Sequence, residues 1–138
     1  MKVLVDTCIW SLALRRIEQP ASNIEVVEFQ ELIEEVRVQL IGPIRQEILS
    51  GIKRKQQFSK LKKILSAFPD LPLTLEDFEL AAEYFNTLRS KGIQGSNTDF
   101  LICAVSTRNN MPIFSTDNDF NRYKEHIPIA FHVPRVTK

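Results

Sequence analysis

Cysteine is scarce in this sequence. Its two cysteines, Cys8 and Cys103, lie far apart and lack C-x-x-C spacing, which excludes a zinc knuckle and a disulfide framework. We therefore predict that both are small buried residues. Histidine is equally rare, and His126 and His132 both come late in the chain, so a nucleophilic Cys–His pair is a poorly supported alternative.

Long hydrophobic runs are also missing. No apolar stretch approaches the roughly 20 residues that a membrane-spanning helix needs, and Asp6 comes too early for a signal peptide. We expect a cytoplasmic protein that makes no contact with a membrane. The net charge is only +1, so any surface that binds nucleic acid must be local.

Short apolar runs alternate with segments of helical periodicity. With 138 residues and 43% hydrophobic content, residues 1–138 are expected to form one domain. Strands are predicted over residues 2–5, 38–42, 111–115 and 129–133. Helices are predicted over residues 7–16, 22–36, 44–52, 56–68, 76–91, 98–110 and 120–126. This order predicts an α/β fold with a central, mainly parallel sheet covered by helices.

Several helices carry boundary signals. Ser22 with Glu25, and Thr74 with Asp77, resemble capping boxes, and Gly92 is suited to end the helix over residues 76–91. The helix over residues 98–110 is apolar nearly all round and is predicted to be central and buried. The predicted core face of the helix over residues 22–36 consists of Ile24, Val27, Leu32 and Val36.

Four carboxylates stand out by their positions. Asp6 ends the first strand and Asp117 follows the third, so both are expected at the edge of the sheet where ligands bind. Asp99 opens the buried helix, beside an apolar run. Glu47 lies within one turn of the core-facing side of the helix over residues 44–52.

Each acid has a structural alternative. Asp6 is equally suited to cap the helix that follows it, and Asp99 is favoured by the dipole of its own helix. Glu47, taken alone, is more typical of solvated surface. Asp119 is the best candidate for a helix cap, so we assign Asp117 to the site and Asp119 to its support.

The joint arrangement favours a metal site. Two like charges about 4 Å apart repel by about 4 kcal/mol at an effective dielectric of about 20. Several such pairs would rival the roughly 5–15 kcal/mol that stabilises a whole domain, so a cluster of four acids must hold protons or cations. Oxygen ligands without histidine or thiolate select Mg²⁺ or Mn²⁺, and two such ions suit the cleavage of a phosphodiester.

Four segments carry a family signature: VLVDT at residues 3–7, IRQEIL at 44–49, LRSKGIQGSNTDFLICAVS at 88–106 and IFSTDNDF at 113–120. Together they resemble the PIN domain, especially the VapC type of bacterial toxin. The resemblance implies a three-layer α/β/α fold and a metal-dependent ribonuclease. The residues that it implies are the catalytic and metal-binding acids Asp6, Glu47, Asp99 and Asp117, with Thr7 and Thr116 near the metals or the phosphate and Asp119 assisting.

Two positions depart from the family pattern. Cys8 stands where the family often has serine or asparagine after Asp-Thr, and Ser115 with Thr116 stands where a Thr-x pair usually precedes the last acid. Neither departure removes a carboxylate, so the expected metal site is retained. They change only the hydrogen bonding expected around it.

A basic segment, KRKQQFSKLKK at residues 53–63, contains no acid. Such a run is about as often a solvated helix face as a surface that binds phosphate. On the second interpretation, Lys60, Lys62 and Lys63 bind RNA phosphates, which fix the position of an RNA without reading its sequence.

The resemblance to VapC toxins also implies partners. These are an RNA substrate, a second copy of the chain in a homodimer, and a cognate antitoxin whose amphipathic segment lies between the first two helices and blocks the metal site. The alternative is a noncatalytic PIN-like module that binds RNA or protein without cleavage. An aspartyl phosphatase is disfavoured because Cys8 stands where its second acid is needed.

Overall fold

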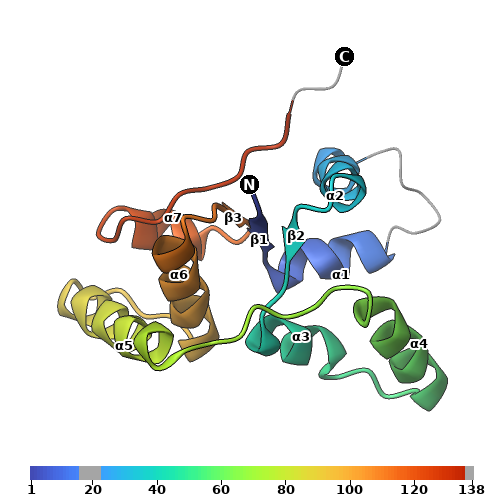
Figure 1. Cartoon of the computed structure of the whole chain (residues 1–138). Coiled ribbons are helices and arrows are strands. Elements are labelled where there is room, and N and C mark those ends of the chain that lie inside the picture. Colours follow the sequence, from blue (N-terminus) through green and yellow to red (C-terminus); the bar gives the residue numbers. More distant parts are fainter. Residues whose placement is uncertain (16–22, 136–138) are drawn as a thin grey trace.

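A small parallel sheet lies at the centre of the molecule (Figure 1), for which a computed structural model describes residues 1–15 and 23–135. Strand β1 (Val3–Val5) lies between β2 (Val38–Gln39) and β3 (Ile113–Phe114), and both pairings are parallel. Every residue of β1 is fully buried, because helices cover the sheet on both faces. The three strands confirm the predicted parallel sheet, although each is shorter than predicted.

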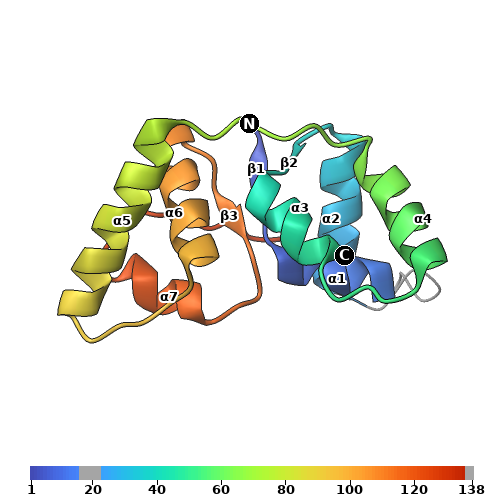
Figure 2. The same ribbon diagram turned by 90° about the horizontal axis from the view of Figure 1, so that it is seen from below.

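Seven helices flank this sheet in the described part of the chain. They are α1 (Thr7–Arg15), α2 (Ile24–Glu34), α3 (Gly42–Leu49), α4 (Lys55–Leu65), α5 (Leu75–Ser90), α6 (Asn97–Asn109) and α7 (Asp119–Lys124). Helices α5, α6 and α7 lie on one side of the strands and α1 to α4 on the other in both ribbon views (Figures 1 and 2). None of the seven is long and apolar enough to cross a bilayer. The α/β fold class is confirmed.

Helix α6 is the central helix of the core. Phe100, Ile102, Cys103 and Val105 are at most 1% exposed, as predicted for a helix that is apolar nearly all round. Along its length α6 packs against α5 (Figure 2). It ends at Asn110, which has a left-handed backbone with φ of 53° and so stops the helix.

The predicted signals at both ends of α5 are confirmed. The Asp77 carboxylate accepts a hydrogen bond from the Thr74 amide at 2.8 Å and completes a capping box. Arg108 Nη1 of α6 also donates to Asp77, at 2.6 Å, so the start of α5 is tied to the end of α6. Gly92 follows the end of α5 with φ of 75°, a conformation that favours glycine.

Helix α2 differs from its prediction at both ends. Asn23 is the N-cap, and its side chain accepts from the Val26 amide at 3.0 Å; Ser22, of the predicted capping box, lies outside the described residues. The core face consists of Val26, Phe29 and Leu32. Ile24 and Val36 are 49% and 73% exposed, so their predicted burial is wrong. Val36 lies beyond the helix with φ of 56°, where helical periodicity no longer sets the direction of a side chain.

The fourth predicted strand, over residues 129–133, is not formed. Only Phe131 pairs with the sheet, through an isolated bridge to Ile113. Pro128 and Pro134 flank this segment, and because each lacks an amide hydrogen and has a fixed φ, the ladder cannot extend past them.

The C-terminal segment is held by charge instead of by strand pairing. Glu28 of α2 is only 2% exposed, and its carboxylate contacts His132 Nε2 at 2.6 Å and Arg135 Nε at 2.9 Å. Arg135 also pairs with Glu35 at 2.7 Å. These contacts fasten residues 129–135 across α2.

Candidate metal centre

Strands β1 and β3 end, and helices α1 and α7 begin, at the carboxyl edge of the sheet (Figure 2). An acidic pocket lies at this edge. The pocket has a volume of about 420 Å³ and is lined by Asp6, Thr7, Cys8, Glu47, Asp99 and Asp117. It therefore contains all four acids singled out from the sequence, brought together from the residue after β1, from α3, from α6 and from the β3–α7 loop. No basic side chain is among these lining residues.

Asp6 and Glu47 form one side of the pocket. Asp6 is 6% exposed, and its carboxylate accepts from the Thr7 amide at 2.8 Å and from the Ser115 hydroxyl at 2.8 Å. The Thr7 hydroxyl donates to Glu47 Oε1 at 2.6 Å. The start of α1 is thus linked both to α3 and to the loop that follows β3.

Asp99 enters from the first turn of α6. Ser96 is the N-cap of this helix, and its hydroxyl accepts from the Asp99 amide at 3.1 Å. The Tyr123 hydroxyl of α7 donates to Asp99 Oδ2 at 2.7 Å. Burial and this bond to a negative group raise the pKa of Tyr123, so its hydroxyl keeps the proton that it donates.

Asp117 and Asp119 contribute from the last loop. One carboxylate oxygen from each of Asp99, Asp117 and Asp119 lies within 4.8 Å of the other two, close enough for the three to share one ion. Asp119 also pairs with Arg122 at 2.8 Å. The prediction that Asp119 caps α7 is wrong, because Asn118 is the N-cap and Asp119 is the first residue of the helix. The Asp119 amide donates to the Asp117 carboxylate at 2.9 Å.

The acids of the pocket disfavour one another's charge. Burial raises the pKa of Asp6, and the charge of Glu47 adds to this effect, against the hydrogen bonds from Ser115 and Thr7. Burial likewise raises the pKa of Asp99, and the charges of Asp6 and Asp117 raise it further. The pocket therefore favours a proton or a cation.

The chemistry of the donors fits a hard divalent cation. Carboxylate and hydroxyl oxygens dominate, as Mg²⁺ and Mn²⁺ prefer. The one soft atom, Cys8 Sγ, is engaged by the Thr116 amide and hydroxyl, at 3.3 and 3.4 Å. Asp6, Glu47, Asp99 and Asp117 are therefore positioned to hold such an ion, with Asp119 within reach of the last two.

Sequence reasoning missed Tyr123, and it named Ser115 and Cys8 near the site without giving either a defined contact. Ser115 bridges Asp6 and the Asp117 amide, at 2.8 and 3.0 Å, and Cys8 lies in the pocket wall instead of the core. Tyr123 comes one helical turn after Asp119, which is the only local signal that could have placed it near an acid. Thr116, predicted near the metals, is turned toward Cys8 and does not line the pocket.

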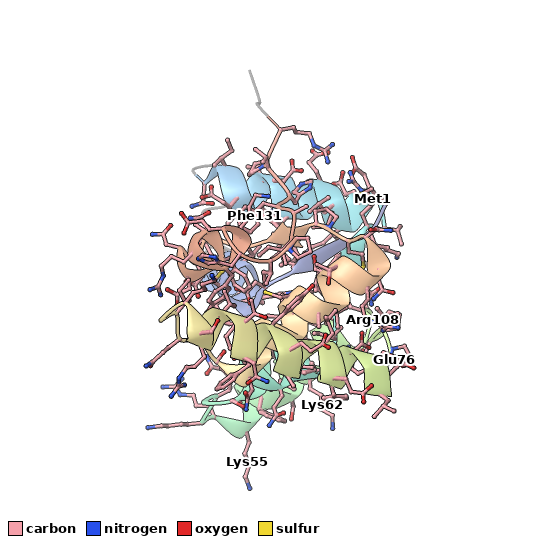
Figure 3. All side chains as sticks on the ribbon, turned by 90° about the vertical axis from the view of Figure 1, so that its left-hand side faces the viewer. Met1, Lys55, Lys62, Glu76, Arg108 and Phe131 are labelled. Carbon is pink, nitrogen blue, oxygen red and sulfur yellow. The ribbon has the colours of Figure 1, made fainter. Side chains whose placement is uncertain are left out.

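The predicted RNA-binding lysines lie on α4, away from these lining residues. Lys60, Lys62 and Lys63 are exposed, and no ion pair engages them within residues 1–15 and 23–135. Lys55 and Lys62 lie at the end of the molecule opposite Phe131 (Figure 3).

Comparison with known proteins identifies similar chains along nearly the whole length. The PIN domain family matches residues 3–126. Ribonuclease VapC11 of Mycobacterium tuberculosis and VapC ribonuclease Mb1587 of Mycobacterium bovis are each 30% identical over 123 residues, which is 86% of this chain and 89% of theirs.

Solved structures show the same fold. VapBC2 from Rickettsia felis, bound to a DNA fragment from its promoter, matches with a TM-score of 0.74 at 20% identity, over 96% of this chain and 98% of that chain. FitAcB from Neisseria gonorrhoeae matches with a TM-score of 0.72 at 18% identity, over 96% and 97% of the two chains.

We expect Asp99→Asn to raise the melting temperature in a chelating buffer near pH 7, because one negative charge leaves the cluster and an oxygen remains to accept the Tyr123 hydrogen bond. The gain should be on the order of 1 kcal/mol for one like-charge contact in a partly hydrated site. It should be absent below the ordinary pKa of 3.8, where this carboxyl is neutral in folded and unfolded chains, and should grow as the pH rises through the raised pKa.

Thermal unfolding of both proteins across this pH range measures the effect. Glu83→Gln, at an exposed position of α5, is the control and should show no gain. Added Mg²⁺ should stabilise the wild type more than Asp99→Asn. A wild type that is more stable than Asp99→Asn in chelator near pH 7 would contradict the electrostatic account.

Proposed function

Because this chain belongs to the PIN domain family, in its VapC branch, we propose that it is a divalent-metal-dependent endoribonuclease and the toxin of a type II toxin–antitoxin pair. The observation that carries the proposal is the gathering of four carboxylates around one pocket without a basic side chain in its lining. In this proposal residues 1–138 act as a single PIN domain in the cytoplasm.

Asp6, Glu47, Asp99 and Asp117 are the proposed ligands of Mg²⁺ or Mn²⁺ and the catalytic acids. When bound there, such ions supply the positive charge that activates a water molecule and stabilises the leaving oxygen of a phosphodiester. Asp119 is proposed to support the site from beside Asp99 and Asp117. The relatives named above as ribonucleases support RNA as the substrate.

The remaining groups of the pocket orient these acids. Thr7 holds Glu47 through its hydroxyl and Asp6 through its amide, so its side chain is occupied on the protein side of the pocket. Ser115 fixes Asp6 relative to Asp117. Thr116 is exposed and is proposed to meet the RNA backbone at the rim of the pocket. Fixed ligand geometry favours Mg²⁺, which demands near-ideal octahedral coordination.

We expect the purified chain to cleave mixed structured RNAs with Mg²⁺ or Mn²⁺ and not with a chelator. Asp99→Asn should lower the rate at least 100-fold, because it removes a charged ligand, and Glu83→Gln should cleave as the wild type does. Gel analysis of end-labelled RNA measures both. Binding of RNA without metal-dependent cleavage would instead favour the noncatalytic module.

Lys60, Lys62 and Lys63 are proposed to bind RNA phosphates. Replacing all three by glutamine should weaken RNA binding and reduce the slope of log affinity against log salt by up to about 2, since each phosphate contact on single-stranded RNA contributes about 0.7. Filter binding at several salt concentrations measures the slope. The control for Lys62→Gln is Lys91→Gln, which replaces an exposed lysine after α5. If Lys62→Gln, Lys91→Gln and the triple variant all gave the same salt slope, α4 would be excluded from the RNA surface.

An antitoxin partner is supported by a further structure of similar fold, VapBC-5 from Mycobacterium tuberculosis, which is described as a member of the VapBC family of toxin–antitoxin systems and matches with a TM-score of 0.66. On this chain Ile24 and Ile33 of α2 are 49% and 38% exposed, and they offer apolar contacts to an amphipathic segment. The antitoxin would be recognised as a protein that suppresses the metal-dependent cleavage at an equimolar ratio.

A homodimer is the last part of the proposal. Leu75 and Phe78 of α5 are 69% and 52% exposed and supply apolar surface for a second copy. Light scattering should give twice the chain mass of 15.9 kDa, and Phe78→Glu should shift it to one chain. Phe58→Glu, at a 38% exposed position of α4, should leave the dimer intact. A single-chain mass for the wild type at micromolar concentration would contradict the dimer.

A further inference from the structure

Tyr123 links α7 to the acidic pocket although it does not line it. Its side chain is fully buried, and its hydroxyl donates to Asp99 Oδ2 at 2.7 Å. This distance is typical of a hydroxyl that donates to a charged carboxylate, a bond stronger than one between neutral groups. The hydroxyl therefore restrains rotation of the Asp99 carboxylate.

The tyrosine ring is itself held in place. It contacts the rings of Phe100 and Phe120, with centroid distances of 5.4 Å in both cases, and both phenylalanines are 1% exposed. Packed aromatic side chains have few alternative rotamers. The position of the hydroxyl oxygen is thus set by the hydrophobic core and not by solvent.

Gly95 provides the space that this hydroxyl needs. A Cβ atom at Gly95 would overlap the Tyr123 hydroxyl oxygen and lie 2.9 Å from Phe100 Cζ. Gly95 does not have a positive φ, so its backbone conformation does not require glycine. Its lack of a side chain serves the close approach of Tyr123, one residue before the N-cap of the helix that carries Asp99.

We propose that Tyr123 is a positioning residue, whose hydroxyl fixes the Asp99 carboxylate for a divalent cation in space kept open by Gly95. The inference rests on the proposed function, because Asp99 must be a metal ligand. Removing a group that hydrogen-bonds to a metal ligand and so orients it commonly lowers the metal affinity about 10–100-fold. Loosening Asp99 should disfavour Mg²⁺ more than Ca²⁺, which tolerates irregular coordination.

The test is a titration of the whole chain with Mn²⁺ in the absence of RNA, in which electron paramagnetic resonance measures the bound ion. Tyr123→Phe keeps the ring and removes only the hydroxyl, and we expect it to bind Mn²⁺ about 10–100-fold more weakly than the wild type. In Tyr123→Phe the affinity for Mg²⁺, measured by its competition with Mn²⁺, should fall more than the affinity for Ca²⁺ measured in the same way. Thermal unfolding in chelator verifies that each variant is folded at the temperature of the titration.

Tyr84→Phe is the matched control. The Tyr84 hydroxyl also bonds to α6, at 2.9 Å from Thr107 Oγ1, and Tyr84 is 9% exposed. Thr107 lies two turns beyond Asp99, so this variant loses a similar hydrogen bond outside the pocket. Its Mn²⁺ affinity should equal that of the wild type. Equal weakening in both tyrosine variants would overturn the inference, because it would reflect a general loosening of α6.

Gly95→Ala tests the second half of the inference. Alone it should weaken Mn²⁺ binding, because the new methyl group displaces the Tyr123 hydroxyl. Added to Tyr123→Phe it should cause a smaller further loss, since the closest overlap, with the hydroxyl oxygen, is gone and only the 2.9 Å approaches to the ring carbons Cζ of Phe100 and of residue 123 remain. Losses that multiply in the double variant would overturn the role of Gly95.

Asp99→Asn separates the inference from the proposed function. If this variant binds Mn²⁺ as the wild type does, the proposed metal site is wrong and the role of Tyr123 falls with it. If Asp99→Asn loses Mn²⁺ while Tyr123→Phe retains wild-type affinity, the metal site stands and only the positioning role is overturned.

Discussion

Repulsion among carboxylates at one edge of the sheet is the constraint on which the rest of this structure depends. Asp6 is almost completely buried, and Asp99 is partly buried beside it with no basic residue in the pocket lining. These charges are tolerated because hydrogen-bond donors face them: the Thr7 amide and the Ser115 and Tyr123 hydroxyls. The donors compensate part of the lost hydration, and the pKa values of Asp6 and Asp99 nevertheless stay raised.

Acids elsewhere in the molecule are treated differently. Glu28 and Asp77 are each 2% exposed, yet their pKa values are lowered. Burial opposes this, but hydrogen bonds from His132 and Arg135 outweigh it at Glu28, and the Thr74 amide and Arg108 outweigh it at Asp77. The carboxylates of Glu28 and Asp77 are thus stabilised by donors and cations of the protein itself. The carboxylates of the pocket have no cationic side chain in its lining and so favour a bound cation.

The scaffold makes such a pocket possible by placing it on packed elements. Asp6 directly follows buried β1, and α6 carries Asp99 on a helix whose inner residues are buried. Tyr123 reaches Asp99 from an aromatic cluster. Side chains held in this way keep their geometry with little conformational entropy left to lose when a ligand binds.

Local sequence determined the elements that depend on neighbours in the chain: the buried strand β1, the apolar helix α6, and the Thr74–Asp77 cap. The parallel-sheet rule also predicted that Asp6 and Asp117 would lie at one edge. Tertiary structure alone decided the contacts between distant segments, because spacing along a chain carries no record of them. The Ser115 bond to Asp6 joins residues 109 positions apart, and the contacts of Glu28 with His132 and Arg135 likewise join α2 to the distant C-terminal segment.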